Sequence, residues 1–494
     1  MPTPSLRYRS RAGRWVIAAS VLGSAMASLD ATVVGIALPT IGREFHATVA
    51  QLQWVVNGYT LALASLLLVG GSLGDRFGRR RLFGVGVAWF TVASVACALA
   101  PGTSALIVLR VLQGVGGALL TPGSLAILQA SFRAEDRGRA IGAWTGLGGV
   151  ASAVGPFLGG WLIAAASWRW IFLINLPVGL VVLVLAVRHV PESKDPDAPR
   201  RVDVLGAALV VVALAGVTYG LTEGPAHGWR GAGPVLALAA GVASAVAFVV
   251  VEARRRAPLL PLELFRHRQF AVTNAVTFVV YGALGGVLFL LPVVLQVVGG
   301  YTPLQSGIAL LPLTMVMLLL SSTSGRVATR IGPRLQMGAG PVVVGCGLAL
   351  LSRIATDSSY VTVVLPSVLV FGLGLAVTVA PLTATALSSA PDEHSGIASA
   401  VNNDVARIGG LVAVAVLPAV SGISGSAYLH PAALASGFRT ATLVAGAWCA
   451  AGGVLAAVGI RNPPRPTATP APGARVAVPL HHCGLDCPPP VAVE

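Results

Sequence analysis

Two charged side chains interrupt long apolar segments of this chain and could carry proton chemistry. Asp30 lies nine residues before Pro39, where an apolar run ends at its outer side. In a helix, Asp30 would therefore lie about 13 Å below that outer end. Arg110 lies about 9 Å deep in another run, with Gln113 one turn further along. An acid near a bilayer centre costs about 2.5–3.5 kcal/mol, so such groups face a protein interior or a wet cavity. We therefore expect Arg110 to interact with Asp30 or its proton, which would couple protonation to conformation.

Each of these side chains also has a simpler interpretation. Asp30 could cap a helix or lie at the membrane interface, but the apolar residues between it and Pro39 argue against that. Arg110 could extend to the outer interface and place only its head group in water. The comparable depths of the two residues favour a buried interaction instead.

A charged loop between two apolar segments is present twice in the chain. The first copy is Gly71-Ser-Leu-Gly-Asp75-Arg76-Phe-Gly78-Arg79-Arg80-Arg81, and the second runs from Gly325 to Arg334, 254 residues later. The second copy keeps two glycines, the central arginine and the last arginine, but has Thr329 in place of Asp75. A repeated charged loop between apolar helices predicts a membrane protein built from two related halves.

One apolar segment is rich in glycine around a proline, which predicts a helix with a small-residue face and a kink. This face could serve ordinary close helix packing, or a pliable and tightly sealed contact between the two halves. Its residues are Gly148, Gly149, Gly155, Pro156, Gly159 and Gly160.

Another apolar segment contains Asp404 and Arg407, which are three residues apart on one helical face. They could neutralise each other as a structural pair or line the transport path. We also regard further polar residues within apolar runs as candidates that could line a cavity. These are Asn57, Tyr59, Gln113, Asn274, Tyr281, Gln296, Asn402 and Asn403.

The composition indicates that a bilayer is the solvent of this chain. Its 494 residues are 55% hydrophobic and 10% charged, with a mean hydropathy of +0.81. Soluble proteins carry roughly 25% charged residues. A net charge of +15 could indicate nucleic acid, but the arginines cluster in short loops between apolar runs, so we predict no nucleic-acid partner.

Neither a cofactor nor a metal site is expected. His481, His482, Cys483 and Cys487 lie in a Pro- and Ala-rich tail, and their spacing matches no zinc template. The chain has no ATP-binding loop. The energy for any transport should therefore come from an ion gradient.

Apolar runs of spanning length predict fourteen membrane helices. With the N-terminus in the cytoplasm, 26 Lys and Arg residues fall on the inner side and 5 on the outer side. This bias obeys the positive-inside rule and places both termini in the cytoplasm. The predicted helices are 15–39, 52–74, 82–100, 104–129, 139–165, 170–190, 203–222, 233–252, 270–298, 304–325, 336–354, 360–387, 395–420 and 438–460.

These helices predict two six-helix bundles separated by an inserted helix pair. The 254-residue offset of the repeated loop is too long for six helices and a linker, which assigns the extra length to the pair. The expected segments are a cytoplasmic arm (1–14), the first bundle (15–190), a cytoplasmic linker (191–202), the inserted pair (203–252), a cytoplasmic connection (253–269), the second bundle (270–460) and a disordered cytoplasmic tail (461–494).

The 71–81 loop resembles the signature loop between helices 2 and 3 of the major facilitator superfamily. Further segments resemble the fourteen-helix drug:proton antiporter branch of that superfamily, over residues 15–460. The glycine-proline segment points to exporters rather than importers. One departure is Gly35, where the branch usually has Asn. The matching segments are Leu29–Pro39, Arg110–Ala118, Gly148–Gly160, Trp168–Pro177 and Leu264–Phe270.

The resemblance implies an all-α polytopic membrane protein with the major facilitator fold. It implies that Asp30 takes part in proton coupling or in binding cationic drugs. It also implies that Asp75 pairs with a loop arginine and with the positive N-terminal end of a helix in the other half, as an ionic latch. Ordinary positive-inside charge is the alternative. The residues of this gating loop are Gly71, Asp75, Arg76, Gly78, Arg79 and Arg80.

Together these features predict a proton-coupled secondary transporter in the inner membrane of a bacterium. It would act as an antiporter that exports drugs or other amphipathic small molecules, cationic or aromatic, in exchange for protons. It would be monomeric and would not be an enzyme. Two alternatives stay open: a proton-coupled importer of a small metabolite, and a membrane sensor that has lost transport.

Overall fold

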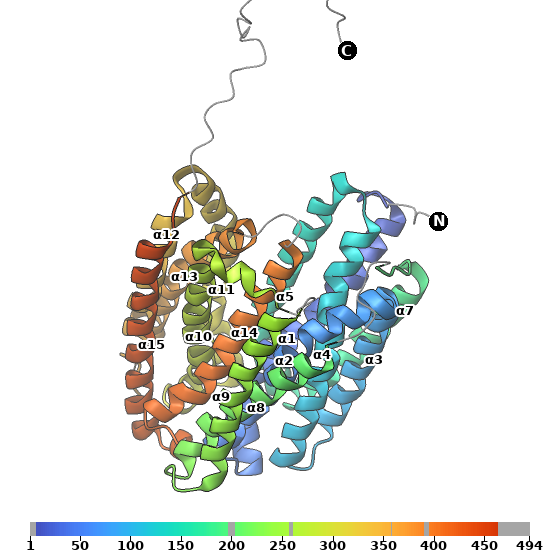
Figure 1. Ribbon diagram of the computed structural model, residues 1–494. Coiled ribbons are helices and arrows are strands. Elements are labelled where there is room, and N and C mark those ends of the chain that lie inside the picture. The colour runs from blue at the N-terminus through green and yellow to red at the C-terminus, as the bar shows by residue number, and fades with distance from the viewer. Residues whose placement is uncertain (1–5, 196–202, 256–259, 357, 390–394, 463–494) are drawn as a thin grey trace, which may run out of the picture. The chain divides into compact units, whose positions relative to one another are not determined.

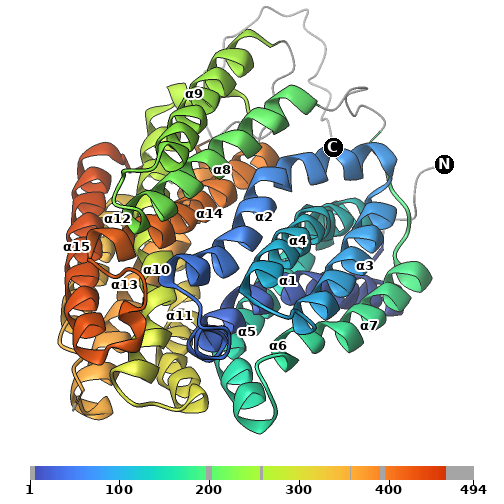
Figure 2. The ribbon, with the colours of Figure 1, turned by 90° about the horizontal axis from the view of Figure 1, so that it is seen from below.

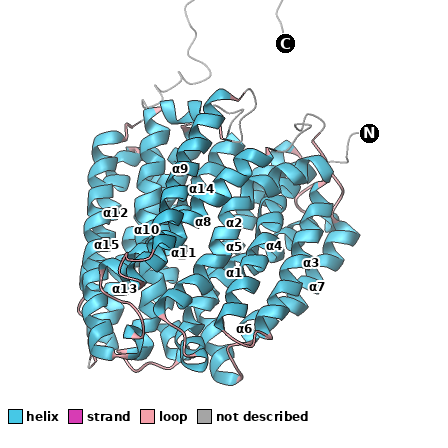
Figure 3. Cartoon of the chain, turned by 60° about the horizontal axis from the view of Figure 1, so that its bottom comes forward, coloured by secondary structure: helices cyan, strands magenta, loops and turns pink. Residues whose placement is uncertain are grey.

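Long helices make up most of the part of the chain that the computed structural model describes (Figure 1). The structure describes residues 6–195, 203–255, 260–356, 358–389 and 395–462. Within these ranges, fourteen helices are long and apolar enough to cross a membrane, which confirms the predicted number. The same ranges contain no strand, only an isolated bridge between Leu6 and Phe132 (Figure 3).

The N-terminal group of helices comprises α1 to α7. A break at Ile174 divides the sixth predicted span into α6 and α7. The bounds are α1 (Arg11–Phe45), α2 (Val49–Phe77), α3 (Arg79–Ala98), α4 (Thr103–Ser131), α5 (Ala134–Ala165), α6 (Trp170–Leu173) and α7 (Asn175–His189).

The inserted pair and the C-terminal group follow. The bounds are α8 (Val204–Ala226), α9 (Ala232–Arg254), η1 (Leu262–Arg266), α10 (Arg268–Val297), α11 (Pro303–Ile331), α12 (Pro333–Leu351), η2 (Tyr360–Val364), α13 (Leu365–Ser388), α14 (Ser395–Val420), η4 (Ala427–Leu429) and α15 (Pro431–Gly459). Several helices extend past the predicted ends, as α1 does, because polar residues continue the helix beyond its apolar core.

The internal repeat is visible in how two equivalent helices begin and end. α2 starts with a capping box of Thr48 and Gln51, and α11 starts with the same box 254 residues later, at Thr302 and Gln305. Both helices have 29 residues and end at a glycine with positive φ. That glycine is Gly78 in the first case, with φ of +116°, which favours a residue without a Cβ.

The helices of each group pack mainly against one another. α4 packs on α2 and α3, while α1 packs on α5 and α7; in the C-terminal group, α12 packs on α13 and α15, and α10 on α14. The two groups meet where α5 contacts α11, α2 contacts α14 and α1 contacts α10. We propose that these groups are the two related halves expected from the repeat.

The inserted helices α8 and α9 pack on each other, and α8 lies against α2 and α14 (Figure 2). One polar contact reinforces this docking, because the indole Nε1 of Trp54 on α2 donates to Glu223 Oε1 on α8 over 2.9 Å. The inserted pair therefore covers the line along which α2 and α14 meet.

Candidate functional site

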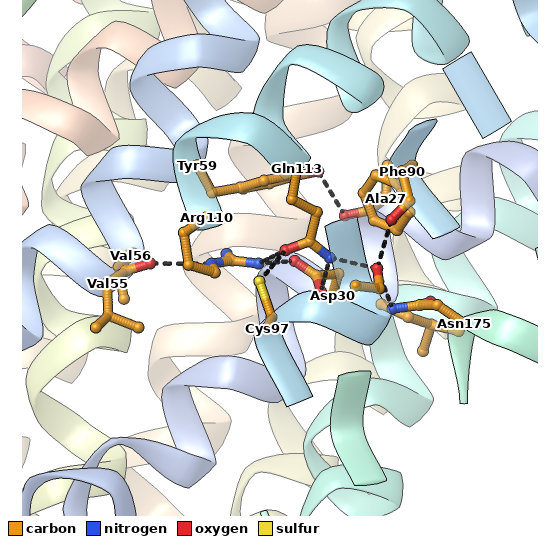
Figure 4. A network of polar contacts seen from close by, with 12 residues as sticks. Ala27, Asp30, Val55, Val56, Tyr59, Phe90, Cys97, Arg110, Gln113 and Asn175 are labelled. Atoms are coloured by element: carbon orange, nitrogen blue, oxygen red, sulfur yellow. Dashed lines mark hydrogen bonds and ion pairs between the residues drawn. The ribbon is translucent and has the colours of Figure 1, made fainter. Parts of the chain in front are cut away.

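A buried ion pair joins α1 to α4 (Figure 4). Arg110 Nη1 donates to Asp30 Oδ2, and both side chains are only 1% exposed. Arg110 Nε also donates to the carbonyl oxygen of Val55 on α2, over 3.0 Å. The structure thus brings together the two charges found in the sequence, and it shows Arg110 buried rather than extended to an interface.

Gln113 holds this pair in a fixed geometry from the next turn of α4. Its Nε2 donates to Asp30 Oδ1 at 2.8 Å and to Ser94 Oγ at 2.7 Å, while its Oε1 accepts from Arg110 Nη1 at 2.6 Å. Ser94 lies on α3, and its hydroxyl also accepts from Asn175 Nδ2 on α7. Together with Val55 on α2, hydrogen bonds therefore link five helices, α1, α2, α3, α4 and α7, in one network around the carboxylate.

Aromatic rings enclose the guanidinium. The centre of the Arg110 guanidinium lies 4.4 Å from the ring centroid of Tyr59 and 5.7 Å from that of Phe172. The Tyr59 hydroxyl donates to the carbonyl oxygen of Ala27 on α1. Cation–π contacts of this kind stabilise a desolvated guanidinium. Tyr59 and Gln113, predicted to line a cavity, are instead buried parts of the ion-pair network.

The two ends of the helices differ in how the halves meet. We name the end with the turns 46–48 and 298–302 the closed end, and the end with Gly78 and Gly332 the open end. At the closed end, Gln53 Nε2 donates to the carbonyl oxygen of Val414 at 2.6 Å. Gln296 Nε2 donates to Ile36 O, and the Tyr428 hydroxyl donates to Ala47 O.

The glycines of α5 follow the same division. A Cβ on Gly160 would lie 2.4 Å from Pro303 O of α11, and a Cβ on Gly155 would lie 2.0 Å from Thr32 Oγ1 of α1. A Cβ on Gly307 of α11 would lie 2.2 Å from the carbonyl oxygen of Pro156. Gly159 likewise faces Val33 closely. Only glycine permits these approaches.

Gly148 and Gly149 do not share in this contact. No neighbouring atom of the described residues lies within 4 Å of the position that a Cβ would occupy at either glycine. The same holds for Gly142 and Gly146 on α5 and for Gly325 on α11. The sequence-based expectation of one sealed face along α5 is therefore wrong at these two positions, because the halves diverge toward the open end.

The gating loop lies at the open end, where Asp75 pairs with Arg79. Oδ1 of Asp75 accepts from Nε of Arg79 at 2.8 Å, and its side chain is 36% exposed. The expected contact with a helix of the other half is not formed among the described residues. Arg76 instead lies over the ring of Phe77, and Gly71 packs near Pro122.

Glu192, which the sequence did not single out, binds the start of α3 beside this loop. Its Oε1 accepts the backbone N–H of Arg80 at 3.0 Å, and its Oε2 accepts that of Arg81 at 3.2 Å. The same carboxylate would collide with a Cβ on Gly78, at 2.7 Å. An acid at a helix N-terminus satisfies free N–H groups and the helix dipole, so Glu192 ties the linker to the loop.

The structure shows no salt bridge between Asp404 and Arg407, so it gives no support to the structural pair, one of the two roles that the sequence left open. Asp404 is 8% exposed, and its Oδ1 has no hydrogen-bond partner among the described residues, like Nε of Arg407. Arg407 lies within electrostatic reach of Tyr59 and Tyr281. Asn57 is 1% exposed, and neither of its amide atoms has a partner in the described structure. It stands one turn from Gln53, on the face of α2 that contacts α14.

Among the other polar candidates, Asn402, Asn274 and Gln296 bond to neighbouring helices, whereas Asn403 does not. Asn402 Nδ2 on α14 donates to Asn274 Oδ1 at 3.1 Å and to Thr277 Oγ1 at 2.8 Å on α10. Gln296 belongs to the closed end, as described above. Asn403 is exposed and bonds to its own helix at Ser399 O. Sequence position alone did not show whether these amides face a partner helix or a path.

Comparisons with known proteins agree with this arrangement. The family described as "Major Facilitator Superfamily" matches residues 20–414. The chain belongs to this superfamily. It is therefore a multi-pass membrane protein of a transporter family, with small molecules as the class of substrate.

Superfamily members with related sequences are resistance and export proteins. The chain is 38% identical over 416 residues to the tetracenomycin C resistance and export protein of Streptomyces glaucescens, covering 84% of this chain and 77% of that protein. It is 36% identical over 423 residues to the methylenomycin A resistance protein of Bacillus subtilis, covering 85% and 90%. These relatives support an efflux transporter.

Solved structures share the major facilitator fold at low sequence identity. A bacterial homologue of the human lysosomal transporter Spinster aligns with a TM-score of 0.66 and 16% identity, over 91% of this chain and 97% of that one. A D-xylose-proton symporter aligns with a TM-score of 0.64 and 15% identity, over 91% and 98%. These likenesses establish the fold of this superfamily member.

The sequence missed several partners of the ion pair. Ser94 and Asn175 are single polar residues within apolar helices, and the carbonyl oxygen of Val55 carries no side-chain signal. Cys97 contributes a weak donor, with Sγ 3.8 Å from Gln113 Oε1. For Ser94 and Asn175, the available signal was a polar residue in an apolar segment at a level similar to that of Asp30.

Proposed function

We propose that this protein is a proton-coupled antiporter that exports drug-like, amphipathic small molecules from a bacterial cell. The observation that carries the proposal is the sealed Asp30–Arg110–Gln113 network, because an ionisable acid buried in a membrane protein is functional by default. The resistance and export proteins related to this chain support the outward direction.

The closed and open ends correspond to one state of an alternating-access cycle. The helices meet through Gln53, Gln296 and Gly160 at the closed end, whereas the glycines of α5 near Gly148 face open space at the other. The positive-inside bias assigns the open end to the cytoplasm, together with both termini. In this state, cargo enters between the halves from the cytoplasm.

The ion pair can transmit protonation to the closed end through α2. Arg110 holds both the Asp30 carboxylate and the carbonyl oxygen of Val55, which is two residues from Gln53. A proton on Asp30 removes its charge and weakens its hold on Arg110. The Arg110 guanidinium must then bond to other acceptors. Because it also holds the carbonyl oxygen of Val55, its movement shifts α2 and loosens the contact of Gln53 with α14.

The exchange of cargo for protons follows from this order of events. A proton from outside neutralises Asp30 and favours release of cargo, and its loss to the cytoplasm restores the charged pair and the affinity. Asp75 and Arg79 act as the latch of the cytoplasmic gate, which closes when the open end comes together. Asp404, Arg407, Asn57 and Tyr281 supply polar groups to the path. The cargo is cationic or aromatic, and the transporter acts as a monomer.

The decisive test measures proton flux in acidified inverted vesicles while cationic dyes and antibiotics are added. We expect the wild type to alkalinise the lumen when cargo is added and Asp30→Asn to give no response. Glu44→Gln is the matched control, because Glu44 is an exposed acid on the same helix, 40% exposed in its pair with Arg169. An unchanged response in Asp30→Asn would move the coupling acid elsewhere, and Asp404 would be tested next.

A further inference from the structure

A second polar site lies at the open end of the N-terminal half, away from the ion pair. Tyr8, Arg9, Arg139 and Ala143 line a cavity of about 430 Å³ that is open to the surface. This volume falls within the roughly 300–1,000 Å³ of small-molecule sites. Two of the four lining side chains are guanidiniums, so the chemistry of the cavity favours an anion.

The segment that carries Tyr8 and Arg9 is held in place by backbone hydrogen bonds. Leu6 N donates to Ser131 O at 2.8 Å, and Arg133 N donates to Leu6 O at 3.3 Å. Tyr8 N donates to Asp136 Oδ2 at 2.9 Å, across 128 residues of sequence. The cavity is therefore a defined gap between the start of α1 and the corner of α4 and α5.

The charge around this cavity is strongly positive. The adjoining segments 6–14 and 133–139 carry seven arginines and two acids. One acid, Asp136, already accepts the N–H of Tyr8 and lies 3.8 Å from Arg139 Nη1. The guanidinium of Arg139 is largely exposed, and no described acid other than Asp136 pairs with it. The site consequently has positive charge left for a ligand.

Exposed aromatic residues at the same end of the N-terminal half indicate that the cavity lies at the level of the membrane interface. Trp15, one helical turn beyond Arg11, is 38% exposed and stacks on His189 at the end of α7, with ring centroids 5.2 Å apart. Phe77 at the same end is 50% exposed. Exposed Trp and other aromatic side chains near arginines are typical of the head-group level of a bilayer.

We propose that this cavity binds the phosphate of an anionic phospholipid head group, with Arg9 and Arg139 as its ligands. Guanidiniums recognise phosphate oxygens through paired, charge-assisted hydrogen bonds. A lipid and a soluble phosphate compound both present a phosphate group. Because the cavity lies at the membrane interface, we favour the lipid. The bound lipid would join α5 to the segment that precedes α1. The proposal requires no transport activity.

Native mass spectrometry of the purified full-length protein can test this directly. Dihexanoylphosphatidylglycerol, dihexanoylphosphatidylcholine and glycerol 3-phosphate would each be titrated against wild type and Arg9→Gln/Arg139→Gln. We expect dihexanoylphosphatidylglycerol to bind the wild type more tightly than dihexanoylphosphatidylcholine does. Its affinity should fall by at least about tenfold in the variant. The control is Arg254→Gln/Arg266→Gln, which removes two exposed arginines of the same end and should change the affinity less than about twofold.

Three outcomes decide between the possibilities. If the affinity for dihexanoylphosphatidylglycerol falls equally in the variant and in the control, the site is overturned and only general attraction between charges remains. Glycerol 3-phosphate binding as tightly as the lipid would keep the phosphate chemistry but overturn the lipid assignment. If the double variant unfolds, Arg9→Gln and Arg139→Gln are tested singly: weakened lipid binding in at least one of them supports the site, and unchanged binding in both opposes it.

Discussion

At the scale of single residues, the buried ion pair explains how a charged acid can be kept inside the membrane. Each polar atom of the Asp30 carboxylate has a donor, and the guanidinium of Arg110 has acceptors on three sides. A buried pair costs desolvation energy that its hydrogen bonds offset only when both partners are present. The stability of the pair thus depends on the charge of Asp30, which is what a coupling device requires.

Removing one partner of the Asp30–Arg110 pair should lower the free energy of unfolding far more than removing both partners. We expect Arg110→Met to destabilise the protein by about 3–5 kcal/mol, since it leaves Asp30 buried without its cation. Asp30→Asn/Arg110→Met should recover much of that loss. Thermal unfolding of the purified variants measures the effect.

An exposed arginine supplies the control for this experiment. Arg169 pairs with Glu44 at 2.8 Å, but its side chain is 35% exposed. Arg169→Met should therefore cost no more than about 1 kcal/mol. Additive losses in the double variant of Asp30 and Arg110 would show that the two side chains do not act as a pair.

At the scale of elements, the contact between α5 and α11 decides which end of the transporter is closed. Backbone meets backbone where Gly160 faces Pro303 and where Gly307 faces Pro156. Small residues allow this approach and let the helices slide apart again. The same α5 carries Gly148 in open space, so one helix provides both a test position and its control.

A methyl group at Gly160 should disfavour the closed end. Its Cβ would lie 2.4 Å from Pro303 O and 2.8 Å from the Cα of Leu304, so backbone must move. Overpacking costs about 1–3 kcal/mol, which shifts a two-state equilibrium by about 5- to 150-fold. Spin labels at His46 and Leu429 should report a longer distance in Gly160→Ala. Gly148→Ala should leave the distance unchanged, and an equal change in both would argue against the contact.

The start of α8 offers a prediction on pH. Burial raises the pKa of Asp203, but the hydrogen bond from Gly206 N and the pair with Arg255 outweigh burial and hold that pKa below its usual range. The stabilisation is present above the unfolded pKa of about 3.9 and is lost as pH falls through the folded value. Asp203→Asn should lower the melting temperature at pH 7, and the difference from wild type should shrink below about pH 4.

Glu135→Gln is the control for this titration. Glu135 is exposed in the first turn of α5, so its removal should change the melting temperature little at any pH. A difference between wild type and Asp203→Asn that grows as the pH falls would contradict the role of the charged form.

At the scale of the whole molecule, the described hydrogen bonds between the two halves gather at one end. Hydrogen bonds of Gln53 and Tyr428 cross between the halves at the closed end. At the open end, Asp75 and Glu192 stay within the N-terminal half and its linker. The inserted helix α8 packs against α2 and α14 where these two helices meet, and neither α8 nor α9 takes part in the described ion-pair network.

Thiol labelling can test both the state and its orientation. In a background without native cysteines, Gly149→Cys should react with a membrane-impermeant reagent at least about tenfold faster in inverted vesicles than in right-side-out vesicles. Ala415→Cys, which is fully buried at the closed end, should stay slow in inverted vesicles. Faster labelling of Gly149→Cys in right-side-out vesicles would reverse the assigned orientation.

Much of the fold and part of the site could be predicted from the sequence. Depth in a helix depends only on residue spacing, so Asp30, Arg110 and Gln113 were correctly expected at one level. Side-chain direction depends on neighbouring helices, so the sequence could not decide between the two roles of Asp404 and Arg407, and it did not reveal the Asn402–Asn274 contact. The N–H groups bound by Glu192 belong to a turn far away in sequence, which no local pattern reveals.

The sequence by itself determined the number of membrane helices, the repeat that relates α2 to α11 and the presence of Asp30 and Arg110 within apolar spans. These follow from hydropathy and spacing, because the bilayer imposes length and internal hydrogen bonding on every span. Only the tertiary structure decided that Arg110 bonds Asp30 and the carbonyl oxygen of Val55, and that Gly160 is packed while Gly148 is free. Those outcomes depend on how distant helices pack, and packing is a property of the assembled chain.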